Sequence, residues 1–156
     1  MPTSLKAYLL ERLRAGAKRY REDLEASNSE TLGFKPGGSA RSAFDYTYEV
    51  VIVNRRTAKR LRGEDPGPFA NDGWITAPVA FCEKAVAQSE FQSTAEEFIA
   101  ALEIIPDDEL ERVIPLPKGE TSPLDLASLN IGHWTYHDGQ LNYTQAISGD
   151  DKVHWE

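Results

Sequence analysis

The sequence predicts an all-α protein, a four-helix bundle with a long irregular connection before its last helix. Four long segments carry apolar residues at steps of three and four, which is the spacing of one helical face. Stretches rich in glycine and proline separate these segments, and no segment alternates apolar and polar residues as a half-buried strand does. A length of 156 residues is typical of one domain, so we expect one helical domain over residues 1–156.

The four predicted helices span approximately residues 3–27, 40–63, 76–102 and 122–148. The first is expected to begin at a cap formed by Thr3 or Ser4, the second after Ser39, and the last at Ser122, which precedes a proline in the first turn. The run from Val50 to Val53 favours a strand when taken alone. We still predict a helix there, because the flanking residues keep the 3.6-residue period and no turn signal interrupts them.

The connections are predicted from their helix-breaking residues. Glycine and proline are frequent in residues 27–39 and 64–73, which we expect to be loops. Residues 104–123 contain four prolines and should cross the bundle irregularly, with one helical turn at residues 109–112. Gly139 lies in the middle of the last predicted helix, where glycine costs about 1 kcal/mol relative to alanine. We therefore expect Gly139 to mark close packing against another helix.

The composition excludes several classes of partner. A net charge of -8 argues against a nucleic-acid-binding protein, which needs a basic surface to neutralise phosphates. No segment reaches the roughly 18 apolar residues of a membrane span, and no export signal is evident at the N-terminus. The single cysteine, Cys82, cannot form an intramolecular disulfide. We therefore expect a cytoplasmic protein that binds neither nucleic acid nor membranes.

Two histidines in the last predicted helix form a candidate metal site. His133 and His137 are four residues apart, so on a helix their side chains project from nearly the same face. Two imidazoles at this spacing can reach one metal ion, but they are also compatible with two hydrogen-bonded core histidines. A metal site needs a third ligand, and the one other histidine, His154, lies in the terminal tail.

The second predicted helix offers Tyr48, Asp45 and Glu49 as third ligands. On a helical wheel Tyr48 lies on the apolar stripe, whereas Asp45 is about 60° and Glu49 about 100° away from it. Tyr48 or Asp45 is therefore better aimed at the bundle interior than Glu49, and the two acids could equally form a solvated edge. Gln140 and Trp134 are expected to line the pocket beside the histidines.

These residues carry a resemblance to a known family. The stretch from His133 to Tyr143, HWTYHDGQLNY, resembles the last-helix signature of the DinB/YfiT-like family, in which two histidines flank a three-residue gap and a Gly-Gln pair follows. The stretch from Arg41 to Tyr48, RSAFDYTY, is similar to the start of the family's second helix, where a serine and an acidic residue precede a histidine. The plan of four helices, with a proline-rich stretch before the last, also resembles that family.

The resemblance implies a divalent metal held by two histidines of the last helix, His133 and His137, and one histidine of the second helix. That third histidine falls on Tyr48, and a tyrosine would have to ionise from a pKa near 10 to bind a metal well. Either Tyr48 binds as a phenolate, or Asp45 or Glu49 replaces it, or the metal has been lost. Two histidines and one carboxylate would suit zinc, nickel or iron.

The resemblance also implies a function. It points to a metal-dependent hydrolase or a thiol-dependent transferase or isomerase, in which the metal activates water or a low-molecular-weight thiol for reaction with a small-molecule substrate. It further implies a homodimer. One alternative is a metal-free module that binds a small molecule in the same pocket. Its lining residues would be Tyr48, Trp134, Tyr136 and Gln140. Another alternative is a structural bundle protein with two core histidines.

Overall fold

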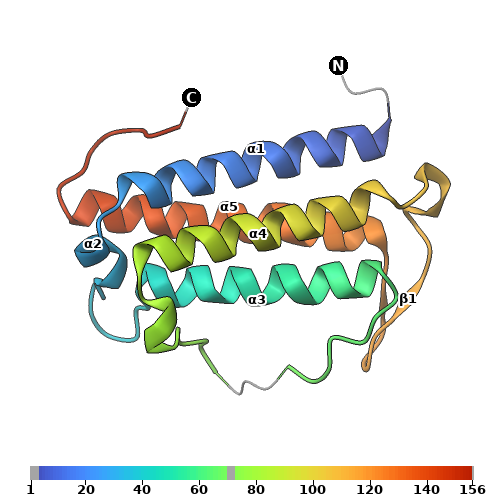
Figure 1. The fold of residues 1–156 in the computed structure, drawn as a ribbon, viewed down its shortest axis with the longest axis horizontal. Helices are drawn as coiled ribbons and strands as arrows, with labels where there is room; N and C mark the ends of the chain where they lie inside the picture. Colours follow the sequence, from blue (N-terminus) through green and yellow to red (C-terminus); the bar gives the residue numbers. More distant parts are fainter. Residues whose placement is uncertain (1–3, 70–72, 156) are drawn as a thin grey trace.

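Four long helices make up the bundle in the computed structural model, which describes residues 4–69 and 73–155. They are α1 (Leu5–Ala26), α3 (Ala43–Leu61), α4 (Lys84–Glu103) and α5 (Pro123–Ile147). Helices α1 and α3 each pack against both α4 and α5. Helices α1 and α5 run in one direction and α3 and α4 in the other (Figure 1). The predicted all-α bundle is confirmed. None of the helices in the described ranges is long and apolar enough to cross a membrane.

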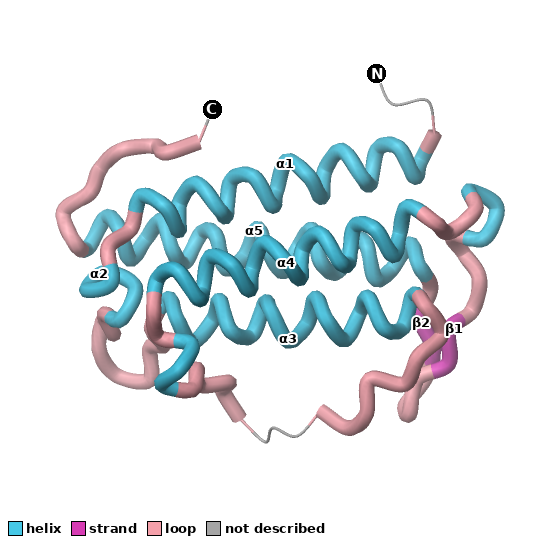
Figure 2. Tube along the Cα trace, in the orientation of Figure 1, coloured by secondary structure: helices cyan, strands magenta, loops and turns pink. Residues whose placement is uncertain are grey.

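Short elements occupy the connections (Figure 2). They are α2 (Ser29–Gly33), the 3₁₀ turns η1 (Val79–Phe81) and η2 (Asp107–Glu109), and the strands β1 (Ile114–Pro115) and β2 (Glu120–Thr121). The two strands pair antiparallel, so the irregular connection before α5 contains a small hairpin that the sequence did not predict. The helical turn expected at residues 109–112 begins two residues earlier, as η2.

Two helices start later than the sequence suggested. Helix α3 is capped by Ser42 and not by Ser39, because Ser42 and Asp45 form a reciprocal capping box. Helix α4 starts at Lys84, since the chain leaves Pro78 through η1 before the α-helix begins. The caps of α1 and α5 are Ser4 and Ser122. The alternative cap of α1, Thr3, lies outside the described residues.

The core is centred on Trp134 of α5. Its ring meets Phe91 and Phe98 of α4 edge-on, with centroids 6.0 and 6.4 Å away, and Tyr20 of α1 stacks on Phe91 at 4.5 Å. The indole N–H of Trp134 donates a hydrogen bond of 2.7 Å to Asn54 Oδ1 on α3. Only 1% of Trp134 is exposed. Its placement is therefore in the centre of the bundle, whereas the sequence suggested the wall of a pocket.

Gly139 does not mark close helix packing, and that prediction is wrong. A Cβ atom built on Gly139 would meet no heavy atom within 4 Å among the described residues. The close approach occurs instead at Gly16 of α1, where a Cβ atom would lie 3.5 Å from the ring of Trp134. The large indole fills the space between α1 and α5, and Gly139 faces outward from the same helix.

Candidate metal centre

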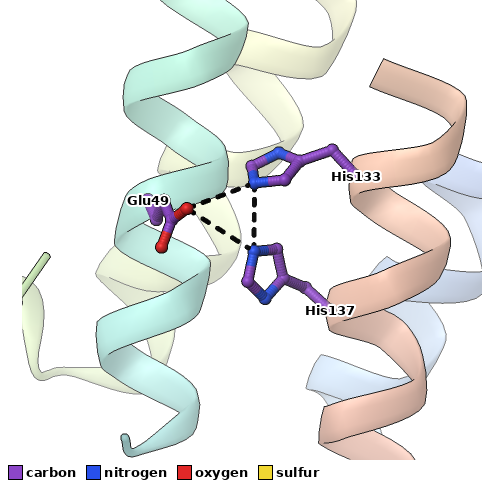
Figure 3. Close-up of side chains that lie close together, drawn as sticks. All are labelled: Glu49, His133 and His137. Carbon is purple, nitrogen blue, oxygen red and sulfur yellow. Dashed lines mark hydrogen bonds and ion pairs between the residues drawn. The ribbon is translucent and has the colours of Figure 1, made fainter. Parts of the chain in front are cut away.

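Three potential metal ligands converge between α3 and α5. Figure 3 shows Glu49 on α3 pointing toward His133 and His137 on α5. Glu49 Oε1 lies 3.5 Å from His133 Nε2 and 3.9 Å from His137 Nε2. The two histidine Nε2 atoms are 3.0 Å apart. Within the described residues this is the one group of three histidine, cysteine or acidic side chains whose ligand atoms all lie within 4.8 Å of one another.

The local sequence explains why the two histidines meet. Helix α5 is a continuous α-helix of 25 residues with Ser122 as its cap, so His133 and His137 lie one turn apart on the same face. Their rings are nearly perpendicular, with an interplanar angle of 82° and centroids 4.5 Å apart. This arrangement lets both Nε2 atoms point at one volume of space, opposite Glu49.

Arg41 holds the Glu49 carboxylate in place. An Nη atom of Arg41 forms an ion pair and hydrogen bond with Glu49 Oε2, which leaves Oε1 facing the histidines. Burial alone would raise the pKa of Glu49, but the hydrogen bond and positive charge of Arg41 hold it below its ordinary value. Glu49 is therefore an ionised carboxylate at neutral pH.

Both histidines are neutral at the same pH. Burial lowers the pKa of His137 to about 4, and the neighbouring His133 contributes to that decrease. Burial also lowers the pKa of His133, against the opposing effect of the Glu49 charge. Metal ions bind the deprotonated ring nitrogen of histidine and the ionised form of a carboxyl group. The three side chains thus have the protonation states that a metal requires.

Gln140 determines which nitrogen of His137 faces the group. The carbonyl oxygen of Gln140 lies 2.7 Å from His137 Nδ1 and can only accept, so Nδ1 carries the proton and Nε2 offers its lone pair. The amide nitrogen of Gln140 in turn donates to the Tyr136 hydroxyl at 3.3 Å. The ring of Tyr46 stacks on His137, with centroids 5.5 Å apart. His133 Nδ1, in contrast, is buried with no hydrogen-bond partner among the described residues.

The spacing of the three donor atoms fits one transition-metal ion. Ligands about 2.1 Å from a metal are about 3.0 Å apart at an octahedral angle and about 3.4 Å apart at a tetrahedral angle. The observed separations are 3.0, 3.5 and 3.9 Å, so in a tetrahedral site the shortest would have to lengthen and the longest to shorten, each by about half an ångström. A set of two imidazoles and one carboxylate suits zinc, iron or nickel.

The structure places Glu49, and not Tyr48, opposite the histidines. The ring of Tyr48 packs against Phe81, with centroids 4.9 Å apart. The apolar stripe of α3 faces the bundle core, and Tyr48 was expected to be the better ligand because it lies on that stripe. The two histidines meet α3 at the edge of its contact with α5, so a residue about 100° from the stripe is the one that reaches them.

Asp45 is fully engaged elsewhere. Its Oδ2 accepts hydrogen bonds from the backbone and hydroxyl of Ser42, and its Oδ1 accepts one of 2.9 Å from the Ala77 N–H. Burial would raise the pKa of Asp45, but these hydrogen bonds and Lys35, 3.3 Å away, hold it below its ordinary value. Asp45 therefore caps α3 and ties the α3–α4 connection to it.

Sequence reasoning missed Arg41 as a functional residue. It precedes α3 by two residues and reaches Glu49 eight positions further on, and helical periodicity does not relate the two because Arg41 lies outside the helix. The one available signal is its place directly before the cap Ser42, where it can fold back over the first turns of the helix.

Comparisons with known proteins agree with this fold. The sequence model of the DinB superfamily matches residues 12–141. A DinB-like protein from Bacillus subtilis, YjoA, has 18% identity and a TM-score of 0.72, over 94% of this chain and 95% of that chain. A conserved protein from Enterococcus faecalis has 16% identity and a TM-score of 0.73, over 94% and 99%. A DinB-like protein from Bacillus cereus has 13% identity and a TM-score of 0.70, over 96% and 95%. A comparison with curated proteins finds no match. Because the superfamily match spans most of the sequence, the chain belongs to the DinB superfamily.

Proposed function

We propose that this protein binds one divalent transition metal, zinc, nickel or iron, through Glu49 Oε1, His133 Nε2 and His137 Nε2. The observation that carries the proposal is the convergence of these three donor atoms between α3 and α5. Their protonation states at neutral pH support it. Three protein ligands leave coordination positions open, as catalytic metal sites require and closed structural sites do not.

The chemistry we propose is that of a metal-dependent hydrolase or a thiol-dependent transferase or isomerase. A divalent metal in this position lowers the pKa of a coordinated water or low-molecular-weight thiol and so supplies a nucleophile near neutral pH. The protein supplies the positioning. Arg41 orients the Glu49 carboxylate, Gln140 sets the protonated nitrogen of His137, and burial keeps the histidines neutral.

A second candidate function is a metal-free bundle that binds a small molecule. The observation that favours it is the 3.0 Å contact between the two histidine Nε2 atoms, because a hydrogen bond from His133 to His137 accounts for this contact without a metal. The homodimer implied by the family resemblance and the single domain over residues 1–156 stay predictions. Sedimentation of the intact protein would check the first, and limited proteolysis the second.

The experiment that tests the proposal is a measurement of metal content by elemental mass spectrometry after exhaustive dialysis. Wild type should retain about one metal per chain, and Glu49→Gln and His137→Ala should lose it while circular dichroism shows an unchanged helical content. Glu90→Gln is the matched control, since Glu90 pairs with Arg55 outside the group.

Tyr48 needs its own test, because the family resemblance placed the third ligand there. Tyr48→Phe should retain the metal. Loss of the metal in this variant would show that Tyr48 is a metal ligand. If wild type holds no metal and takes up none of zinc, nickel or iron, the proposal is wrong and the metal-free function stands.

A further inference from the structure

A cavity of about 480 Å³ lies beside the three candidate metal ligands, Glu49, His133 and His137, which we call the metal group. Three of its lining residues also contact His137. Tyr46 stacks on the imidazole, Tyr136 meets it edge-on at 4.9 Å, and the amide oxygen of Gln140 accepts a hydrogen bond from its Nδ1–H. The cavity is therefore separated from the metal group by one layer of side chains. Its volume is typical of pockets that hold a small organic molecule.

The cavity presents a cationic side chain, Arg41, although the chain carries a net charge of -8. Arg41 is the one charged side chain among the described residues that line it, and no aspartate or glutamate lines it there. The Arg41 side chain is only 11% exposed, so its charge is weakly screened by solvent. Its guanidinium group has five N–H donors, and its one hydrogen bond within the described part of the chain goes to Glu49. The other N–H donors of Arg41 are therefore available to bind an anion.

Four aromatic side chains line the cavity. The guanidinium carbon of Arg41 lies over the Trp74 ring, 4.6 Å from the ring centroid, in a cation–π contact. Tyr46, Tyr136 and Tyr143 line the cavity as well. Aromatic walls of this kind favour a planar, largely apolar body.

Gly139 leaves room for that body. It lines the cavity from the middle of α5, and a Cβ atom on it would meet no described heavy atom within 4 Å. Helix packing therefore does not require glycine here, and glycine weakens a helix relative to alanine. A larger side chain at this position would project into the cavity.

We infer that this cavity binds a small molecule with a carboxylate group and a planar apolar body, anchored by Arg41 and flanked by Trp74 and the tyrosines. This inference rests on the proposed function, because it names the substrate class of the same site. A substrate whose carboxylate contacts Arg41 has its other end near the layer formed by Tyr46, Tyr136 and Gln140, and so close to the metal group.

Benzoate and the neutral benzamide are matched probes for the inference. Their binding to the metal-free, full-length protein is measured by isothermal titration calorimetry, and benzoate should bind at least 5-fold more tightly. Arg41→Gln should weaken benzoate binding about 10-fold or more and leave benzamide unchanged. Arg55→Gln, which removes an exposed arginine paired with Glu90, is the control and should change neither. Gly139→Leu should weaken both probes.

Glu49→Gln separates this inference from the metal proposal. The Glu49 carboxylate competes with a bound anion for Arg41, so its removal should tighten benzoate binding, whereas the same variant should lose the metal. Equal affinity for benzoate and benzamide, unchanged benzoate affinity in Arg41→Gln, or no benzoate binding in both wild type and Glu49→Gln would overturn the inference. Because no metal is present in these titrations, absence of metal from the native protein would overturn the proposed function alone.

Discussion

A buried pair of carboxyl groups makes the stability of this protein depend on pH. Asp23 of α1 is fully buried and Asp138 of α5 is nearly so, and each has one buried oxygen without a hydrogen-bond donor among the described residues. Asn142 donates to the other oxygen of Asp23 at 2.8 Å. Burial, followed by the charge of Asp23, raises the pKa of Asp138 to about 7. A proton on Asp138 supplies a missing donor to this pair.

The sign of the effect follows from this raised pKa. The folded chain binds the Asp138 proton more tightly than the unfolded chain, where the pKa is 3.8. The stabilisation is therefore complete below pH 3.8 and is lost as the pH rises through about 7. Between pH 6 and pH 8 the loss is at most about 1.4 kcal/mol. Because Asp138 shares the proton with Asp23 and keeps some solvent contact, we expect about 1 kcal/mol.

Asp138→Asn tests this reasoning. The asparagine amide keeps a donor for Asp23 but does not titrate, so the variant should gain about 1 kcal/mol of unfolding free energy relative to wild type between pH 6 and pH 8. The assay is urea unfolding of both metal-free proteins at the two pH values. The other titratable groups are the same in both proteins, so the difference between the two proteins cancels their contribution. A difference that stays constant within about 0.3 kcal/mol would refute the reasoning.

Three other changes have defined outcomes. Gln140→Ala should lower metal affinity about 10- to 100-fold in a chelator competition, because His137 loses the partner that fixes its tautomer, and an unchanged affinity would contradict that role. Asn54→Leu should lower the free energy of unfolding by about 2 kcal/mol in urea, because the Trp134 N–H is left buried without an acceptor; a loss below about 0.5 kcal/mol would count against it. Gly139→Ala should raise the free energy of unfolding by up to about 1 kcal/mol, and a lower melting temperature would show that the helix does not tolerate the Cβ atom.

The fold could be predicted because its cause is local. Each long helix shows a periodic apolar face, and burying four such faces leaves few architectures. The start of α3 could also have been found in the sequence, because Ser42 has an acidic residue three positions later, as a capping box requires, and Ser39 does not. The hairpin of β1 and β2 has two residues in each strand, too few for a periodic signal.

The site was only partly predictable because it joins two helices. The spacing of His133 and His137 is a property of one helix, and the sequence therefore shows it. The choice of Glu49 depends on where α5 crosses the surface of α3, which no pattern within α3 contains. Trp134 illustrates the same limit, since it was expected to line the pocket beside the histidines, while its burial and its hydrogen bond to Asn54 place it in the core.

Arg41 connects the metal proposal with the carboxylate proposal. Its guanidinium group balances the charge of Glu49 on one side and lines the cavity on the other. A divalent ion at the Glu49 group would add two positive charges behind the cavity wall and would draw the carboxylate of Glu49 toward itself. Both effects weaken the neutralisation of the Arg41 charge by Glu49, so the cavity would bind an anion more strongly. Since binding free energies are reciprocally linked, a carboxylate in the cavity must then strengthen metal binding by the same factor. An anionic substrate would thus help to retain the ion that acts on it.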